Sequence, residues 1–371
     1  MRINKLKFLR NIIICIVVFF IVAFILNTAP GFKRDKFQDI TNIIIGDEDL
    51  TEELENLIYV SPNETVYLSI KDTENLLNAK VYYEEDGKNI ITICGTKVSA
   101  ISIDNKSIYI NGSKKDILEP AIERDGTKYL PISEMELVFN IEIEYIKEND
   151  VVIIDKLDKG IIKADVSADA EIKFKPRGLS KTIGEIKQGE KVSCFYTTSK
   201  GWRLIRTSSG NLGYVKANTL DNEYILRQDM KEKEDAKGLS ISNNTFTTYK
   251  GNQKVRVIIE NINNIEETYS KENLLENEVL WAKINNEVLE GNNAISNYNL
   301  RLEIINNIIN KVIKNKISGV LVDFEDINES TLKFINELLP RLREIGITTG
   351  LKVNAGLNGE DFVKVVDYII N

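Results

Sequence analysis

The sequence predicts a multidomain chain with four kinds of structure: an N-terminal transmembrane helix, a mostly-β domain of the α+β class, a small β-barrel and a partial (β/α)8 TIM barrel. Three observations support this fold class. An apolar run at 12–26 follows several basic residues. Apolar and polar residues alternate over much of 57–221, which is typical of half-buried strands. From Lys254 onward, apolar runs alternate with segments of helical periodicity, which indicates βα units.

The composition excludes several classes of function. The chain has 371 residues, a formal net charge of −8 and no histidine. The negative charge argues against a nucleic-acid partner, because phosphate binding needs a basic surface. The lack of histidine removes Ser-His-Asp and Cys-His catalysis and nearly all familiar zinc sites. Acid–base chemistry therefore falls to Asp, Glu, Lys, Tyr or Cys. The three cysteines lie far apart, so no disulfide framework is implied.

Residues 1–28 are interpreted as a basic flank and a signal anchor. The apolar run from Ile12 to Leu26, together with Phe8 and Leu9, is about long enough to cross a bilayer. The basic residues before it place the N-terminus in the cytoplasm. We therefore predict a single-pass membrane protein with the bulk of the chain on the cell-wall side. A cleaved signal peptide with a poor site at "NTA" is the alternative. The acidic residues 29–56 predict a tether or, equally, a short amphipathic helix.

Residues 57–157 contain short alternating segments separated by Asn, Asp and Gly turns. The run "AKVYYEEDGKNIITICGTKV" predicts a hairpin, "KYLP" leads into a short helix from about Ile132, and a closing hairpin runs from Ile141 to Ile154. This order resembles the copper amine oxidase N-terminal-like domain of exported bacterial proteins. The resemblance implies no copper chemistry, since copper would lack its usual histidine ligands. We interpret the domain as a spacer.

Residues 163–221 combine alternating strands with glycine turns, which is typical of small barrels. The segment resembles a bacterial SH3-like domain at Gly189, at Gly201-Trp202 and at Gly213-Tyr214. In cell-wall proteins such domains often bind peptidoglycan, so the resemblance implies a peptidoglycan partner. Trp202 and Tyr214 are expected in the core. The polar, charged residues 222–250 are interpreted as a linker.

Residues 251–371 predict the partial barrel. The runs "KVRVIIEN", "EVLWAKINN", "GVLV" and "GITTGLKV" indicate strands, and continuous apolar runs are typical of parallel strands buried on both faces. Apolar residues at helical spacing predict one helix from Leu300 to Ile313 and a second around Leu332 to Leu342. Pro340 is expected to kink or shorten the second helix. Trp281 is expected in the core rather than stacked on a sugar.

Two carboxylates follow the third of these strands, at Asp323 and Glu325. Residues two apart in a strand share a face, so Leu321, Asp323 and Glu325 should point into the barrel mouth while the intervening residues pack under the helices. The carboxyl ends of the strands carry the chemistry of such barrels. Like charges at close range raise one pKa, which can leave one acid protonated. Cleavage of a glycosidic bond requires such an acid.

The segment "SGVLVDFED" resembles the signature strand of glycoside hydrolase family 18, the chitinase-like family, in its spore-cortex and cell-wall branch. Gly319, Asp323, Phe324 and Glu325 match the signature, and the preceding helix also fits, including Arg301. At two other positions of the signature the family's acids are absent, because Ser318 and Leu321 stand there.

The resemblance implies a substrate-assisted retaining mechanism on N-acetylglucosamine linkages, in peptidoglycan or a chitin-like polymer. Glu325 would be the general acid and base. Asp323 would orient the acetamido group and stabilise the oxazolinium that it forms. Such a mechanism needs no metal and no cofactor.

Three alternatives stay open. A full barrel needs about 250 residues, and fewer than half of these follow Lys254, so the first alternative is that the sequence is a fragment. A degenerate barrel would make the chain a non-catalytic cell-wall-binding or assembly protein. Asp323 and Glu325 could also be acids that cap the next helix, a role open equally to Asp326 or Asn328.

Overall fold

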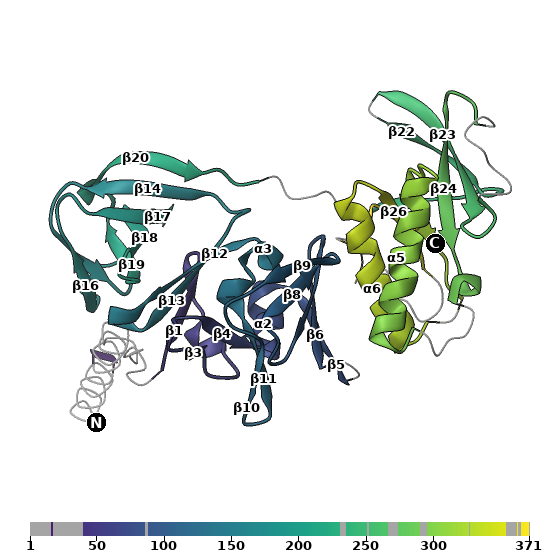
Figure 1. Cartoon of the computed structure of the whole chain (residues 1–371). Coiled ribbons are helices and arrows are strands. Elements are labelled where there is room, and N and C mark those ends of the chain that lie inside the picture. The colour runs from purple at the N-terminus through teal and green to yellow at the C-terminus, as the bar shows by residue number, and fades with distance from the viewer. Residues whose placement is uncertain are drawn as a thin grey trace, which may run out of the picture. The chain divides into compact units, whose positions relative to one another are not determined.

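The computed structural model describes residues 16–17, 40–85, 88–230, 235–250, 252–265, 274–289, 295–325, 327–353, 362 and 365–370. The chain divides into two compact units, and each is assembled from two separate segments (Figure 1). Unit 1 comprises Met1–Val66 and Asn140–Lys231, and unit 2 comprises Tyr67–Phe139 and Glu232–Asn371. The described structure is mostly β, with four α-helices.

The predicted anchor at 12–26 falls outside the described residues except for Ile16 and Val17. Within the described ranges, no helix is both long and apolar enough to cross a membrane. On this finding, the prediction of a transmembrane helix is corrected, and the predicted single-pass location with its membrane partner is withdrawn.

Unit 1 begins with a four-stranded sheet in the order β12-β13-β1-β2. The closing hairpin predicted from the sequence is β12 (Ile141–Ile146) with β13 (Val151–Lys156). Strand β1 (Asn42–Ile45) pairs in parallel with β13 and buries Ile43, Ile44 and Ile45. The segment interpreted as a tether therefore includes a core strand. The remaining elements here are β2 (Glu48–Asp49), η1 (Thr51–Glu53) and β3 (Tyr59–Val60).

The second sheet of unit 1 has seven antiparallel strands in the order β16-β15-β19-β18-β17-β14-β20. It is an open, curled sheet with β16 and β20 at its edges, and the prediction of a small SH3-like β-barrel is corrected accordingly (Figure 1). Trp202 is buried, as expected, whereas Tyr214 is half-buried and its hydroxyl lies 2.5 Å from that of Tyr196. The strands are β14 (Ile161–Val166), β15 (Ala170–Lys173), β16 (Thr182–Ile186), β17 (Lys191–Thr197), β18 (Trp202–Thr207), β19 (Leu212–Lys216) and β20 (Leu220–Arg227).

The first segment of unit 2 contains an antiparallel meander of five strands in sequence order, β5 to β9. Helix α2 (Ile70–Leu77) begins at Ser69, whose side chain accepts a hydrogen bond from the Asp72 amide, and ends at Asn78 in the left-handed region. Ser is favoured before the first turn of a helix and Asn after its last turn, so Ser69 and Asn78 predict where this helix begins and ends. The other elements are β4 (Val66–Ser69), β5 (Lys80–Glu84), β6 (Asn89–Cys94), β7 (Lys97–Ser102), β8 (Ser107–Ile110), β9 (Ser113–Asp116), β10 (Ile122–Arg124), β11 (Thr127–Pro131), η3 (Ile132–Glu134) and α3 (Glu136–Phe139).

The second segment of unit 2 forms a seven-stranded sheet in the order β21-β27-β26-β25-β24-β23-β22. Its strands are parallel except β22, which pairs antiparallel with β23. Helices α5 and α6 lie side by side on one face (Figure 1). The elements are β21 (Lys237–Leu239), β22 (Thr245–Lys250), β23 (Gln253–Asn261), β24 (Glu278–Ile284), η7 (Asn286–Leu289), α5 (Tyr298–Lys314), β25 (Gly319–Val322), α6 (Glu329–Glu344), β26 (Thr348–Lys352) and β27 (Tyr368–Ile370).

The prediction of a partial (β/α)8 barrel is wrong. Strand β22 turns back as a hairpin and occupies the edge beside β23, which departs from the all-parallel order of that barrel. In the described part of the chain the sheet is open, because β21 and β22 are its two edges and do not pair with each other. It is strongly curled, since the rings of Phe246 on β22 and Tyr368 on β27 lie 6.2 Å apart although four strands separate them. Helix α6 continues through Pro340 to Glu344, so the expected shortening does not occur.

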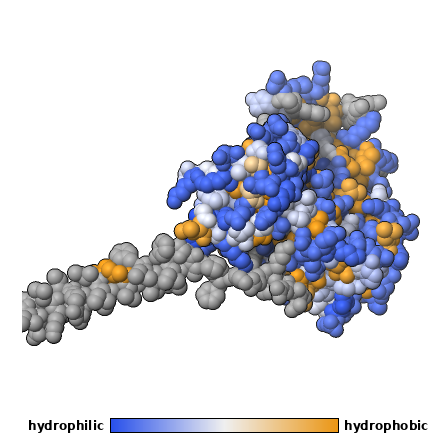
Figure 2. Space-filling model, turned by 90° about the vertical axis from the view of Figure 1, so that its left-hand side faces the viewer, coloured by the Kyte–Doolittle hydropathy of each residue, from blue (hydrophilic) through white to orange (hydrophobic). Residues whose placement is uncertain are grey.

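Large exposed apolar side chains, such as Leu118 and Leu179, are spread over both units. On the face shown in Figure 2, hydrophilic residues prevail and hydrophobic residues are scattered among them. Scattered apolar residues are normal on a protein surface and do not by themselves indicate a binding site.

Candidate active site at the carboxyl end of β25

Strand β25 is buried on both faces of the sheet. Val320 and Val322, followed by Phe324, belong to the core that includes α5 and α6 residues. Leu321 belongs to the separate core on the other face, with Trp281 and Ile370. For these four apolar residues, the alternation predicted from the sequence is confirmed.

Asp323 follows β25 at the carboxyl edge of the sheet. Its amide donates a 2.9 Å hydrogen bond to the Ile284 carbonyl, which continues the pairing with β24. The side chain of Asp323 is 16% exposed, and its carboxylate forms an ion pair with the Lys352 ammonium at 3.2 Å. The register explains the contact: Val322 pairs with Leu351, so Asp323 and Lys352 are the next residues on adjacent strands.

Glu325 lies two residues further, with an exposed side chain. Its amide donates a 2.9 Å hydrogen bond to Asn286 Oδ1. Between the two acids, Phe324 is buried, and its ring lies 5.9 Å from that of Phe334 on α6. The buried ring anchors the loop, so that one acid is held at the sheet edge and the other is presented to solvent.

Asn328 caps helix α6, since its side chain accepts a hydrogen bond from the Thr331 amide at 3.0 Å. The capping role considered for Asp323 and Glu325 is thus filled by Asn328.

Further polar side chains lie at the same edge, at the ends of β23 and β24. Asn261 Nδ2 donates to Glu287 Oε2 at 2.7 Å, and Asn286 holds the Glu325 loop. Sequence reasoning missed Lys352 and Asn286. A signal for Lys352 was present, because a lysine ends the strand that follows the signature strand.

Arg301 and Trp281 lie elsewhere. Arg301, on α5, is fully buried and binds Glu337 and Glu84, neither of which is at the carboxyl edge. Trp281 is 3% exposed and packs edge-on against Phe246 with ring centroids 5.0 Å apart, so it is a core residue, as expected.

Two cavities lie at the opposite, amino end of the strands. They have volumes of about 520 and 480 Å³, and both are lined by Gly346, Ile347 and Thr348 at the start of β26. Neither includes Asp323 or Glu325. We place the candidate site at the carboxyl edge, because ligands of parallel α/β sheets bind outside the carboxyl ends of the strands. Among the described residues, no group of three or more Cys, Asp or Glu side chains could hold a metal ion.

A family model, the copper amine oxidase N-terminal domain, matches residues 46–154. A sporulation-specific glycosylase from Bacillus subtilis is a similar solved structure, with 19% identity over 34% of this chain and 53% of that chain and a TM-score of 0.24. NlpC1 from Trichomonas vaginalis is another, with 9% identity over 39% of this chain and 41% of that chain and a TM-score of 0.16. No curated protein matches the chain.

The chain spans about half the length of these solved structures or less. With such low TM-scores, neither likeness supports a conclusion about the sheet or its chemistry. The family model concerns residues 46–154, within which the β5–β9 meander and β12 lie, and it ends inside β13. The predicted resemblance of this region to the copper amine oxidase N-terminal domain is thereby confirmed.

Proposed function

We propose that the chain is a glycoside hydrolase of the family 18 type that cleaves N-acetylglucosamine linkages in peptidoglycan or a chitin-like polymer. The observation that carries this proposal is the position of Asp323 and Glu325 directly after the parallel strand β25. Asp323 is half-buried and held by Lys352, whereas Glu325 is exposed and accessible to a polymer. This division suits one acid that orients the substrate and one that transfers a proton.

In the proposed reaction, Glu325 donates its proton to the glycosidic oxygen as the bond to the anomeric carbon breaks. The acetamido oxygen of the substrate attacks that carbon and forms an oxazolinium, while Asp323 accepts a hydrogen bond from the acetamido N–H. Water then adds to the anomeric carbon and loses a proton to Glu325, which returns to its starting state. The same carboxyl group thus acts first as acid and then as base.

The test is the release of reducing ends from purified peptidoglycan and from chitin by the protein and by its Glu325→Gln variant. We expect activity on at least one polymer and its loss in the variant. Glu329→Gln is the matched control, because Glu329 is an acid four residues further whose side chain is 84% exposed. Equal activity in wild type and Glu325→Gln would contradict the assignment.

A second candidate function is binding without catalysis, as in a cell-wall-binding or assembly protein. Leu321 favours it, since a buried apolar side chain stands where the signature carries an acid. Retention on insoluble peptidoglycan, with no reducing ends released from either polymer, would support this second function.

A further inference from the structure

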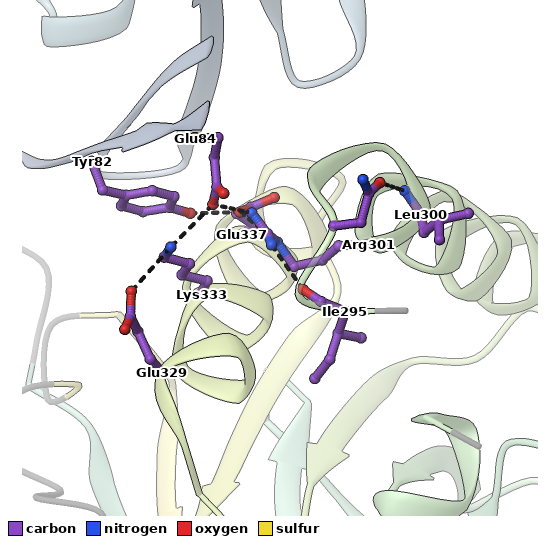
Figure 3. Close-up of polar contacts among 9 residues, drawn as sticks. Tyr82, Glu84, Ile295, Leu300, Arg301, Glu329, Lys333 and Glu337 are labelled. Carbon is purple, nitrogen blue, oxygen red and sulfur yellow. Dashed lines mark hydrogen bonds and ion pairs between the residues drawn. The ribbon is translucent and has the colours of Figure 1, made fainter. Parts of the chain in front are cut away.

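A cluster of buried polar side chains lies between strand β5 and helices α5 and α6, all within unit 2 (Figure 3). Arg301 on α5 is fully buried and makes three contacts. Its Nε donates to Glu337 Oε1 at 2.9 Å, its Nη1 to the Ile295 carbonyl at 2.8 Å, and its Nη2 to Glu84 Oε1 at 2.6 Å. The proposed reaction uses none of these groups.

Strand β5 contributes to the cluster through one face. Lys80, Tyr82 and Glu84 are two residues apart and therefore point to the same side of the strand. Lys80 Nζ donates to Asn336 Oδ1 at 3.3 Å, and Tyr82 donates to Glu337 Oε1 at 2.5 Å. Glu84 accepts from Arg301 at its end of the strand. Each residue of this stripe thus meets a different residue on α6 or α5.

Apolar contacts surround the polar stripe. Ile91, Ile93, Val98 and Ala100, from β6 and β7, form a buried cluster with Tyr298 of α5. At the far end of α6, the Glu344 carboxylate accepts from Thr96 at 2.5 Å and pairs with Lys97. The contact therefore extends along α6 from Lys333 to Glu344, with a buried centre and more exposed charges at its end.

Strand β5 adds a carboxylate to the charges of the helix face. On the helices themselves, Arg301 pairs with the fully buried Glu337, and Lys333 pairs with Glu329 at 3.1 Å. Glu84 supplies the second negative charge and contacts both cations, Lys333 at 3.3 Å. Loss of a partner from a buried charge is unfavourable, and without Glu84 the fully buried Arg301 would keep one carboxylate, Glu337, in place of two.

We propose that the β5–β9 sheet, which lies in the family-matched region, is a fixed internal partner of the α5–α6 helix layer and not a spacer. The surface of α5 and α6 that this sheet covers is complementary to the alternating side chains of β5, which are the basic Lys80, the phenolic Tyr82 and the acidic Glu84. The sheet with the candidate active site therefore depends on the β5–β9 sheet for its stability, although residues 117–236 separate the two sheets in the sequence.

The test uses the full chain with a protease site at residues 231–234, cleaved after folding. We expect the two pieces to co-migrate on size-exclusion chromatography, held by the β5 contact. The Glu84→Gln variant should raise the dissociation constant of the pieces at least tenfold. Asp155→Asn is the matched control: it breaks the buried ion pair with Arg206, at 2.6 Å inside unit 1, and should leave co-migration unchanged.

If the Glu84→Gln chain does not fold, Tyr82→Phe gives a milder test, because it removes one hydrogen bond to Glu337 and no charge. It should raise the dissociation constant severalfold. Separation of the wild-type pieces after cleavage would overturn the proposal. Equal dissociation constants for wild type, Glu84→Gln and Tyr82→Phe would also overturn it.

Discussion

The indole ring of Trp281 on β24 lies against the backbone of Gly319, its direct partner on β25. A Cβ atom at position 319 would overlap ring atoms Cε2, Nε1 and Cδ2 of the indole. Glycine is thus required for close packing of these two strands. The glycine of the signature-like segment has a structural reason in this protein, whatever the chemistry of the acids that follow it.

Gly319→Ala should therefore destabilise unit 2. Overpacking of a core typically costs about 1–3 kcal/mol, because side chains and backbone must shift to accommodate the added methyl group. Urea unfolding followed by tryptophan fluorescence measures the change. Gly238→Ala is the control, since a Cβ there meets no atom within 4 Å. Equal stability of the two variants would show that Trp281 does not restrict position 319.

Arg301→Met should destabilise the protein much more than removal of an exposed arginine. Loss of one partner from a buried ion pair costs about 3–5 kcal/mol, because the buried Glu337 would lose the cation that it contacts, while Glu84 would keep Lys333. Arg256, more than half exposed, pairs with Glu278 at 3.3 Å, and Arg256→Met should cost about 1 kcal/mol or less. Thermal unfolding of both variants at one pH gives the comparison. A loss for Arg301→Met no larger than for Arg256→Met would contradict the buried network.

We expect the stability of the protein to fall at alkaline pH, because Tyr82 and Tyr298 are buried where the β5–β9 sheet contacts helices α5 and α6. Burial, with a smaller contribution from the charge of Glu337, raises the pKa of Tyr298 to about 12. Burial and the Glu337 carboxylate also hold the pKa of Tyr82 well above its usual value. In the unfolded chain a tyrosine ionises near pH 10, so the unfolded state loses its protons first.

The contribution of Tyr298 is thus fully present below about pH 10 and is lost as the pH rises toward about 12. The melting temperature measured across this range should fall less steeply for Tyr298→Phe than for wild type. Identical slopes would mean that Tyr298 ionises alike in both states.

Lys352 should be a positioning residue of the proposed reaction. It holds the Asp323 carboxylate, and misplacement of a catalytic group by about 1 Å can reduce the rate roughly a hundredfold. On the proposed function, Lys352→Met should lower kcat tenfold or more with a smaller change in KM, and Lys352→Arg should restore part of the loss. Lys311→Met, on α5, is the control. A normal kcat for Lys352→Met would show that the ion pair does not position Asp323.

Much of the local structure around the candidate site could be predicted from the sequence. Apolar residues at helical spacing predicted α5 and α6. The alternation of residues along the strand predicted that Val320, Val322 and Phe324 pack under the helices. These features depend on nearby residues. The open sheet was not predicted, because residues 222–250 were interpreted as a linker and β22 lies within them. The sequence Gly-Asn at 251–252, between two strand-like runs, is in fact a recognised hairpin signal.

Contacts between distant segments were equally inaccessible. Arg301 was associated with a family pattern, but its partner Glu84 is 217 positions away, and no local periodicity connects the two. The ion pair of Asp323 with Lys352 depends on the register of β25 and β26, in which Val322 pairs with Leu351 in the core under the helices. The acids could be identified from the sequence, whereas their partners required the fold.

The most direct test of the central claim is mass spectrometry of the soluble fragments that the protein releases from peptidoglycan. The proposed chemistry predicts sugar fragments with a new reducing N-acetylglucosamine end and intact peptide stems, one water added for each bond cleaved. These fragments should be absent with Glu325→Gln and present with Glu329→Gln. New free amino groups on cleaved peptide stems without new reducing ends, or the same sugar fragments from Glu325→Gln, would contradict a glycosidase in which Glu325 transfers the proton.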